Sequence, residues 1–403
     1  MNGKYKSLHP DISHHPPFHM SHLISSESVT KGHPDKVADQ ISDAVVDACL
    51  GQDPSSRVAC ETLVKNNAVV VAGEISTRAR LDIEAIARVV IANIGYTDPA
   101  LGFDARGATV LQLIGNQSGD IARGVDRTDP REQGAGDQGL MYGYATNETF
   151  NRMPLPIHLA HLISRNLQFW RESGELPYLR PDGKSQVTVE YASGEIPPRI
   201  DAVVLSTQHS PDVTQERLRD DVRTRLEKLL ENRGVDSRTT YLINPTGNFE
   251  IGGPVGDCGL TGRKIIVDTY GGVGRHGGGA FSGKDPSKVD RSGAYAARWA
   301  AKHVVNANLA DSCEVQIAYA IGVAKPVSIH VDTFGTGVVD DDQIARAIRA
   351  TFDLRPAAII EDLRLLQTKY LPLASNGQMG REDLDVAWER TPRVDDLMRH
   401  ISG

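Results

Sequence analysis

A glycine-rich stretch between Gly252 and Gly283 holds twelve of the chain's 38 glycines, a density that lets backbone approach a ligand closely. In it and just beyond it, basic side chains alternate with acidic ones: Arg263, Lys264, Arg275, His276, Lys284 and Lys288 with Asp257, Asp268, Asp285 and Asp290. Clustered cations suit a polyphosphate, and carboxylate oxygens are the ligands that Mg²⁺ requires when it bridges phosphates. The stretch therefore predicts a magnesium-polyphosphate site, although any one of these charges alone is typical of a solvated surface.

Two nucleotide-binding signatures occur here in incomplete form. Residues 272–277 match GxGxxG after an apolar run, 265–267, that we expect to be a strand, but glycines follow where a helix should begin. Residues 278–284 match GxxxxGK, yet Asp285 stands where a P-loop needs Ser or Thr, and a proline follows it. A dinucleotide-binding dehydrogenase and a P-loop ATPase are therefore weak alternatives.

A second charged feature lies in a predicted β-hairpin, with strands over 57–64 and 68–75 and a turn at Asn66-Asn67. A two-residue turn makes Glu61 and Glu74 diagonal neighbours on one face, roughly 7 Å apart. Two like charges on a mostly apolar face are costly unless a cation compensates them. The pattern predicts a bound cation or a cationic substrate group here, and a face open to water is the alternative.

The elements around these residues follow a repeating order. Apolar periodicity predicts a helix over 37–49, between Pro34 and Gly51, and another over 83–94 that Gly95 closes. The order helix, hairpin, helix then recurs at 157–172, 186–206 and 214–232, and again at 292–307, 314–333 and 342–352. These repeats predict an α/β (α+β) fold of three similar βαββαβ units, each a sheet covered by helices.

Polar, glycine-bearing segments at 32–36, 134–139 and 282–290 precede the first helix of each unit. Because helix N-termini attract anions, we expect these segments to form walls of the phosphate site.

Composition excludes several classes of protein. With 44 Lys and Arg against 52 Asp and Glu, the net charge is −8, so nucleic acid and anionic membranes are unfavourable partners. Apolar runs fall far short of the ~18 residues that a spanning helix needs, and the first thirty residues lack a signal-peptide core, so we expect a cytoplasmic protein. The scattered cysteines predict reduced thiols, mostly buried: Cys49, Cys60, Cys258 and Cys313.

The expected organisation begins with a histidine-rich tail, residues 1–21, which has no apolar periodicity. We expect this tail to be mobile, with adventitious metal binding as the alternative. The domains that we expect are N-terminal, 22–122, central, 133–250, and C-terminal, 251–390, followed by a segment at 391–403.

Three motifs together resemble a known family: Ser26 to Lys36, Gly134 to Gly139, and Gly277 to Asp290. The chain is similar to S-adenosylmethionine synthetase of the bacterial type over nearly everything after residue 22. The resemblance implies three similar domains about a pseudo-threefold axis, in a homodimer or dimer of dimers with active sites between subunits. It also implies transfer of the adenosyl group of ATP to the sulfur of L-methionine, followed by hydrolysis of tripolyphosphate to pyrophosphate and phosphate, with about two Mg²⁺ per site and K⁺.

Residue by residue, the resemblance implies ATP contacts from His33, Asp182, Lys184, Phe249, Asp257, Arg263, Lys264, Ala280 and Lys284, with His33, Lys184, Arg263, Lys264 and Lys284 catalytic. It implies methionine contacts from Glu74, Gln117, Asp137, Asp257 and Lys288, Mg²⁺ ligands in Asp35 and Asp290, and a K⁺ ligand in Glu61. The segment 115–129 resembles the family's flexible lid.

Two positions depart from the family pattern. Asn248 stands where many relatives have Arg or Lys, and Lys325 replaces a residue that is commonly acidic in bacterial relatives. The alternative class of function is a catalytically silent relative that acts as a regulatory or assembly subunit. Joint retention of six charged or polar groups favours an active enzyme: His33, Asp35, Lys184, Lys264, Lys284 and Asp290.

Overall fold

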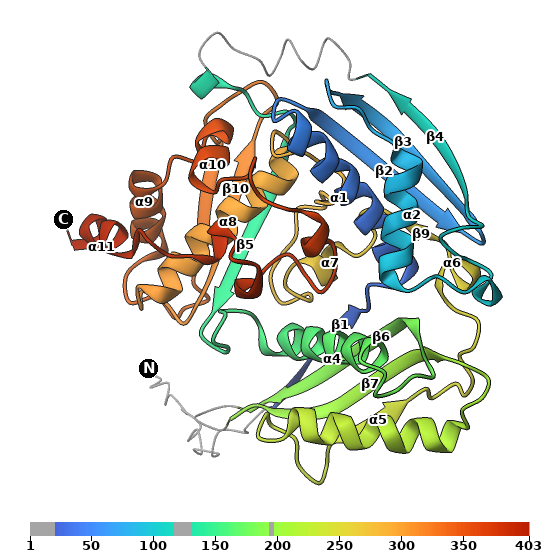
Figure 1. Cartoon of the computed structure of the whole chain (residues 1–403). Coiled ribbons are helices and arrows are strands. Elements are labelled where there is room, and N and C mark those ends of the chain that lie inside the picture. Colours follow the sequence, from blue (N-terminus) through green and yellow to red (C-terminus); the bar gives the residue numbers. More distant parts are fainter. Residues whose placement is uncertain (1–20, 117–129, 193–196, 403) are drawn as a thin grey trace, which may run out of the picture.

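Three β-sheets organise the chain in the computed structural model, which describes residues 21–116, 130–192 and 197–402 (Figure 1). The predicted mixed α/β class is confirmed. The first unit consists of β1 (His22–Val29), α1 (Pro34–Gln52), β2 (Arg57–Lys65), β3 (Ala68–Ser76), α2 (Ile83–Ile94) and β4 (Thr109–Gly115). This order is the predicted βαββαβ.

The second unit repeats that order with β5 (Gly139–Thr146), α4 (Leu155–Glu172), β6 (Leu179–Tyr191), β7 (Arg199–His209), α5 (Gln215–Leu230) and β8 (Thr240–Ile243). The third unit contains α6 (Gly253–Gly256), β9 (Gly259–Leu260), α7 (Ile265–Asp268), α8 (Val289–Asn306), β10 (Ser312–Tyr319), β11 (Ser328–Asp332), α9 (Asp341–Thr351), α10 (Pro356–Asp362) and α11 (Val394–Ser402). Its helix, hairpin and helix follow the prediction, but within residues 197–402 the expected closing strand is absent, and α10 and α11 follow α9 instead.

Each unit sends its first strand into the sheet of another unit. β1 pairs with β6 in the sheet β1-β6-β7-β8, β5 pairs with β10 in the sheet β11-β10-β5, and β9 pairs with β2 in the sheet β4-β3-β2-β9. The three exchanges close a cycle from the first unit to the second, the third and back. Segments that follow these strands therefore lie where two units meet.

The predicted hairpin register is confirmed. Glu61 lies opposite Ala72, Ala59 lies opposite Glu74, and Asn66 adopts the positive φ of 50° that the tight turn requires. Both glutamates are exposed on the face of the sheet that α1 does not cover.

Two expectations about local structure are wrong. Residues 265–267 belong to the helical turn α7, in which Asp268 N–H donates to the Lys264 carbonyl at 2.9 Å. A three-residue apolar run has no period that distinguishes a strand from a helix, so the pattern could not decide. The segment 134–139 leads into strand β5 and not into a helix, because α4 begins only at Leu155.

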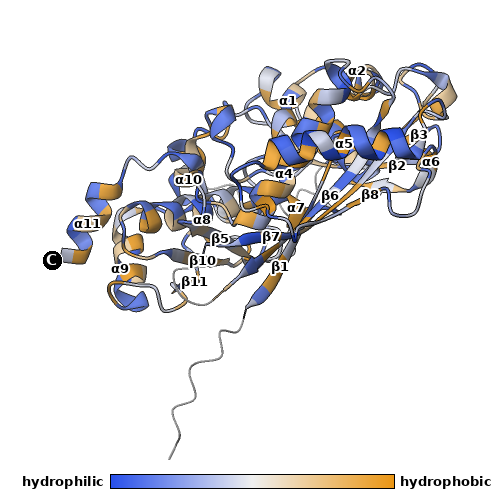
Figure 2. Cartoon of the chain, turned by 90° about the horizontal axis from the view of Figure 1, so that it is seen from below, coloured by the Kyte–Doolittle hydropathy of each residue, from blue (hydrophilic) through white to orange (hydrophobic). Residues whose placement is uncertain are grey.

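Helices cover one face of each sheet and supply much of the core. Helix α5 buries Leu218, Val222, Leu226 and Leu230, which are spaced four residues apart, while Figure 2 shows extensive hydrophilic colouring on its outer surface. The thiols of Cys49, Cys60 and Cys313 are free and buried, as predicted, and Cys258 is partly buried. Within the described ranges, no helix combines the length and the apolar composition that crossing a bilayer takes.

Candidate active site

His33 caps the N-terminus of α1 and carries a neutral imidazole. Its side chain is buried, and its Nδ1 accepts a hydrogen bond of 3.2 Å from the Asp35 backbone N–H. Burial, followed by the positive charges of Lys264 and Lys184, lowers the pKa of His33 from 6.5 to about 2. Because Nδ1 is an acceptor in a neutral ring, the proton sits on Nε2, which is a hydrogen-bond donor.

Asp35 joins the first helical turn of α1 to the third unit. Its Oδ2 accepts from Lys264 Nζ at 2.6 Å, its Oδ1 accepts from Leu260 N–H at 3.0 Å, and Arg263 Nε lies 3.9 Å from Oδ1. Asp35 is buried, whereas half of the Arg263 side chain is exposed. The pairing of β9 with β2 brings these residues together from positions more than two hundred residues apart.

A row of aspartates along α1 holds the third unit in place. They are Asp35, Asp39, Asp43 and Asp47, and they accept hydrogen bonds of 2.8–3.0 Å from the backbone N–H groups of Leu260, Gly262, Gly283, Tyr370 and Leu371. Carboxylates four residues apart lie along one side of a helix, so one element fixes several loops at once.

Behind Asp35 lies a fully buried charged group, of which the sequence analysis placed Lys36 and Asp268 at the phosphate site but did not name Asp39. Lys36 Nζ lies 2.9 Å from Asp39 Oδ2 and also bonds Asp268. Burial would lower the pKa of Lys36, but the charges of Asp268 and Asp39 outweigh it and raise that pKa. Burial raises the pKa of Asp39 to about 7, against the opposing effect of Lys36.

The second unit contributes Asp182 and Lys184 from β6. The Thr30 N–H donates to the Gly183 carbonyl at 2.9 Å, which holds this strand beside the segment that leads to His33. Asp182 Oδ2 accepts from Gly253 N–H at 2.8 Å, while its buried Oδ1 has no hydrogen-bond partner. Burial, opposed by the Gly253 hydrogen bond, raises the pKa of Asp182 to about 6.

Phe249 lies close to the backbone segment that donates to Asp182. A Cβ atom added to Gly252 would lie 2.9 Å from the Phe249 ring, so the ring packs closely against the backbone that leads to Gly253. Asp257 follows at the end of α6, is exposed, and acts electrostatically on His33 and Asp182. These two residues extend the group toward solvent.

A further charged group surrounds Lys284. Its Nζ lies 2.7 Å from Asp290 Oδ2, and its neighbour Lys288 pairs with Asp285. Arg291 donates to the Lys284 carbonyl at 2.8 Å and pairs with the buried Asp43, so the backbone of Lys284 is tied to α1. Neither Asp43 nor Arg291 was predicted.

Glu61 belongs to the surroundings of Lys284. Ala59 forms a β-bridge with Lys284, and Cys60 N–H donates to the Gly283 carbonyl at 2.9 Å. Burial raises the pKa of Glu61, Lys284 opposes that rise, and Asp39 and Glu74 add to it. The surroundings therefore disfavour the Glu61 carboxylate overall, and Lys284 is the charge that opposes this effect.

The predicted site residues thus fall into two neighbouring groups. One contains His33, Asp35, Asp182, Lys184, Phe249, Asp257, Arg263 and Lys264, and the other contains Glu61, Glu74, Lys284, Lys288 and Asp290. Ala280 lies between them, because a Cβ on Gly262 would come within 2.5 Å of the Ala280 Cβ. Asp137 is exposed just before β5, and Gln117 lies outside the described residues together with most of the predicted lid.

The carboxylates of the candidate site fit a metal cation that keeps much of its hydration shell. Within residues 21–116, 130–192 and 197–402, no group of three or more His, Cys, Asp or Glu side chains is gathered for a metal ion. Mg²⁺ is commonly held by one or two carboxylates together with substrate phosphates. Asp35 and Asp290, each beside a lysine, match that pattern.

An arrangement of lysines, a neutral histidine donor and isolated carboxylates suits an enzyme acting on a magnesium-bound polyphosphate. Three family models match the chain: the S-adenosylmethionine synthetase N-terminal domain at residues 21–119, the central domain at 132–249 and the C-terminal domain at 251–390. The chain belongs to the S-adenosylmethionine synthetase family. Its activity is that of a methionine adenosyltransferase, with ATP and methionine as substrates, and the family uses Mg²⁺ and K⁺.

Proposed function

We propose that the groups around His33 and Lys284 act together on ATP and L-methionine, first transferring the adenosyl group and then hydrolysing the released tripolyphosphate to pyrophosphate and phosphate. The observation that carries the proposal is the convergence of His33, Lys184 and Lys264 from three units, with Lys284 nearby. No side chain needs to form a covalent intermediate.

In the transfer step, the methionine sulfur attacks C5′ of the ribose, and the bond from C5′ to the tripolyphosphate oxygen breaks. The bonding electrons remain on that oxygen, so negative charge grows on the leaving group. The Nε2–H of neutral His33 is a suitable donor to this oxygen, and the ammonium groups of Lys184, Lys264 and Lys284 neutralise the charge. Arg263, half exposed, is available to the outer phosphates.

Bound Mg²⁺ would stabilise the phosphate charge as a Lewis acid, about two ions per site, with Asp35 and Asp290 as its protein ligands. Glu61 is proposed as the K⁺ ligand, since its carboxylate lies on an exposed face beside Glu74. Lys264 and Lys284 pair with these two aspartates and orient their side chains within the site.

The nucleoside end is proposed to lie between Phe249, which packs on adenine, and Asp182. The unpartnered Oδ1 of Asp182 is a hydrogen-bond acceptor, so it suits a ribose hydroxyl or an amino group of ATP. For methionine the proposed contacts are Glu74, Gln117, Asp137, Asp257 and Lys288. Carboxylates among them suit its ammonium group, and the lysine suits its carboxylate.

We further propose a homodimer, or a dimer of dimers, with active sites between subunits. The uncovered face of the first sheet carries Leu111 and Leu113, which are 50% and 58% exposed, in register with Val70 and Ala72 beside the two glutamates. A contiguous apolar face next to predicted substrate ligands supports burial by a second copy. From its motifs, we also propose that the enzyme is of the bacterial type. From its composition, we propose that it is cytoplasmic.

The direct test incubates the purified chain with ATP, L-methionine, Mg²⁺ and K⁺. We expect the sulfonium product together with equal amounts of pyrophosphate and phosphate, each dependent on methionine. A silent regulatory relative would bind ATP without forming the sulfonium. ATP hydrolysis without methionine at the same rate would contradict the proposed order of steps.

A further inference from the structure

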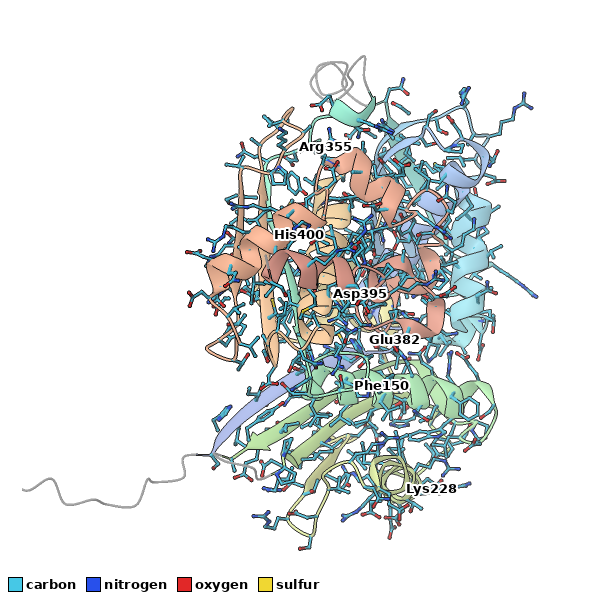
Figure 3. All side chains as sticks on the ribbon, turned by 90° about the vertical axis from the view of Figure 1, so that its left-hand side faces the viewer. Phe150, Lys228, Arg355, Glu382, Asp395 and His400 are labelled. Carbon is cyan, nitrogen blue, oxygen red and sulfur yellow. The ribbon has the colours of Figure 1, made fainter. Side chains whose placement is uncertain are left out.

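A cavity of about 290 Å³ lies away from the candidate active site. Helix α4, the segment before it and residues 379–383 line it, and no residue that we assign to ATP, methionine or metal is among them. Figure 3 labels Phe150 and Glu382, two of its lining residues, close together where the central unit meets the C-terminal segment. A space of this size accommodates a small organic molecule.

Two residues of α4 that line this cavity each have a buried nitrogen atom without a hydrogen-bond partner. These atoms are Nε2 of His161 and Nε of Arg165, one helical turn apart. His161 is 95% buried, its Nδ1 is already engaged with Ser28 Oγ at 2.8 Å, and its Nε2 packs against Gly377, where an added Cβ would lie 2.5 Å away. Buried polar groups almost always have partners, which makes two orphans in one wall informative.

The cavity lining also carries positive charge, which Asp383 offsets in part at Arg165. Across residues 21–116, 130–192 and 197–402, neither Arg165 nor Arg233 has a carboxylate within ion-pair distance. The two acids that line the cavity are engaged elsewhere, Glu382 with Lys302 at 2.7 Å and Asp383 with Arg381 at 2.9 Å.

The behaviour of the titratable groups agrees with this excess. Burial and then the charge of Arg165 lower the pKa of His158 to about 4, and the same two causes lower that of His161. Burial and then Arg381 lower the pKa of Arg165, with only Asp383 opposing. An anion would relieve these unfavourable effects.

An aromatic rim borders the charged wall. Phe150 is 76% exposed and its ring meets the His158 ring edge-on, with centroids 5.5 Å apart. Guanidinium groups favour carboxylates and phosphates, and an exposed phenyl ring favours a flat apolar surface. We propose that this cavity binds a small aromatic oxyanion, with its phosphate or carboxylate at Arg165 and Arg233 and its ring against Phe150.

Calorimetric titration of the full chain tests the proposal, with phenyl phosphate, benzoate and inorganic phosphate as probes. A saturating non-hydrolysable ATP analogue with Mg²⁺ occupies the active site, so binding there does not contribute. We expect phenyl phosphate or benzoate to bind, and the tighter of the two identifies the oxyanion that the cavity prefers.

Variants then locate the binding. Arg165→Met should weaken binding of the aromatic probe about tenfold or more. Arg233→Gln and Phe150→Ser should each weaken it about threefold, and both positions are exposed, so these substitutions should not disturb folding. Lys228→Gln, an exposed lysine on α5 that Figure 3 shows well away from Phe150, should leave the affinity unchanged.

Failure of both aromatic probes to bind at millimolar concentration would overturn the proposal. Unchanged affinity in Arg165→Met and Arg233→Gln together would do the same. Equal affinity for inorganic phosphate and phenyl phosphate would contradict the proposed contact between the ligand's ring and Phe150. None of these measurements depends on adenosyl transfer, so a failure here is distinct from a failure of the proposed active site.

Discussion

Replacing Lys284 with methionine removes one positive charge from the proposed tripolyphosphate site and leaves a side chain of similar length. The backbone at this position is held by Arg291, whose Nη1 lies 2.8 Å from the Lys284 carbonyl, and by Asp43, which accepts from Gly283 N–H at 2.9 Å. Because these contacts do not involve the ammonium group, Lys284→Met should retain the local fold.

The expected effect on stability is small. Lys284 and Asp290 are each about one-fifth exposed and lie 2.7 Å apart, and a partly solvated pair of this kind is worth about 0–1 kcal/mol. The effect on rate should be much larger, since charge on the leaving tripolyphosphate grows toward the transition state. Losing one preorganised charge-stabilising donor costs about 10²- to 10³-fold in rate, or about 3–4 kcal/mol, so kcat should fall by that factor and ATP affinity by less than tenfold.

Single-turnover formation of the sulfonium, followed by acid quench at fixed Mg²⁺, measures the chemical step, and equilibrium titration measures ATP affinity. Lys325→Met, at an exposed lysine in the same unit, is the matched control and should behave as the parent. A parental rate in Lys284→Met would remove this lysine from the chemistry. Equal losses of rate and ATP affinity would mean that it binds ATP without favouring the transition state.

A second readout separates the charge effect from a distortion. Lys284 opposes the rise in the pKa of Glu61 that burial causes, so its removal should raise that pKa further. Glu61 then becomes a carboxylate only at higher pH. If Glu61 binds K⁺, activation by K⁺ should shift to higher pH in Lys284→Met.

Four further predictions follow from the geometry. His33→Gln should lower kcat about 10²- to 10³-fold. The pH–rate profile between pH 6 and 9 should not change, because a pKa of about 2 keeps His33 neutral throughout this range. Loss of an acidic limb of the profile in the variant would show that protonation of His33 matters. The pKa of Asp182, about 6, means that its carboxylate forms as pH rises through 6, so ATP affinity measured by titration should fall below that pH in the parent and lose this dependence in Asp182→Asn. Glu61→Gln should weaken K⁺ activation in steady-state assays and leave the Mg²⁺ requirement in place, and an unchanged K⁺ response would exclude Glu61 as the ligand. Leu113→Asp, on the exposed sheet face, should shift the sedimentation coefficient toward the monomer, whereas an unchanged assembly would place the subunit contact elsewhere.

Local patterns in the sequence were sufficient for much of the secondary structure. The register of the hairpin follows from the turn at Asn66-Asn67, and helix α2 begins and ends where its periodicity and Gly95 indicate. The aspartates four residues apart on α1 were readable as a polar row beside the apolar stripe, yet nothing in the sequence says what they contact. The donors to these carboxylates are backbone N–H groups more than two hundred residues away, and such pairing leaves no mark on side-chain type.

The cyclic exchange of strands explains why the sequence predicts which residues belong to the site but not how they are positioned relative to one another. Strand β9 has only two residues, too few for any periodic signal, although its pairing with β2 brings Lys264 to Asp35. β1 likewise leaves its own unit for β6, which brings His33 beside Lys184. Lys36 lies in the first unit and Asp268 in the third, so both units must be in place before this buried pair forms, because Asp268 would otherwise be a buried charge without compensation. Folding of the site and association of the units are therefore one event, so a single unit expressed alone should lack a formed phosphate site.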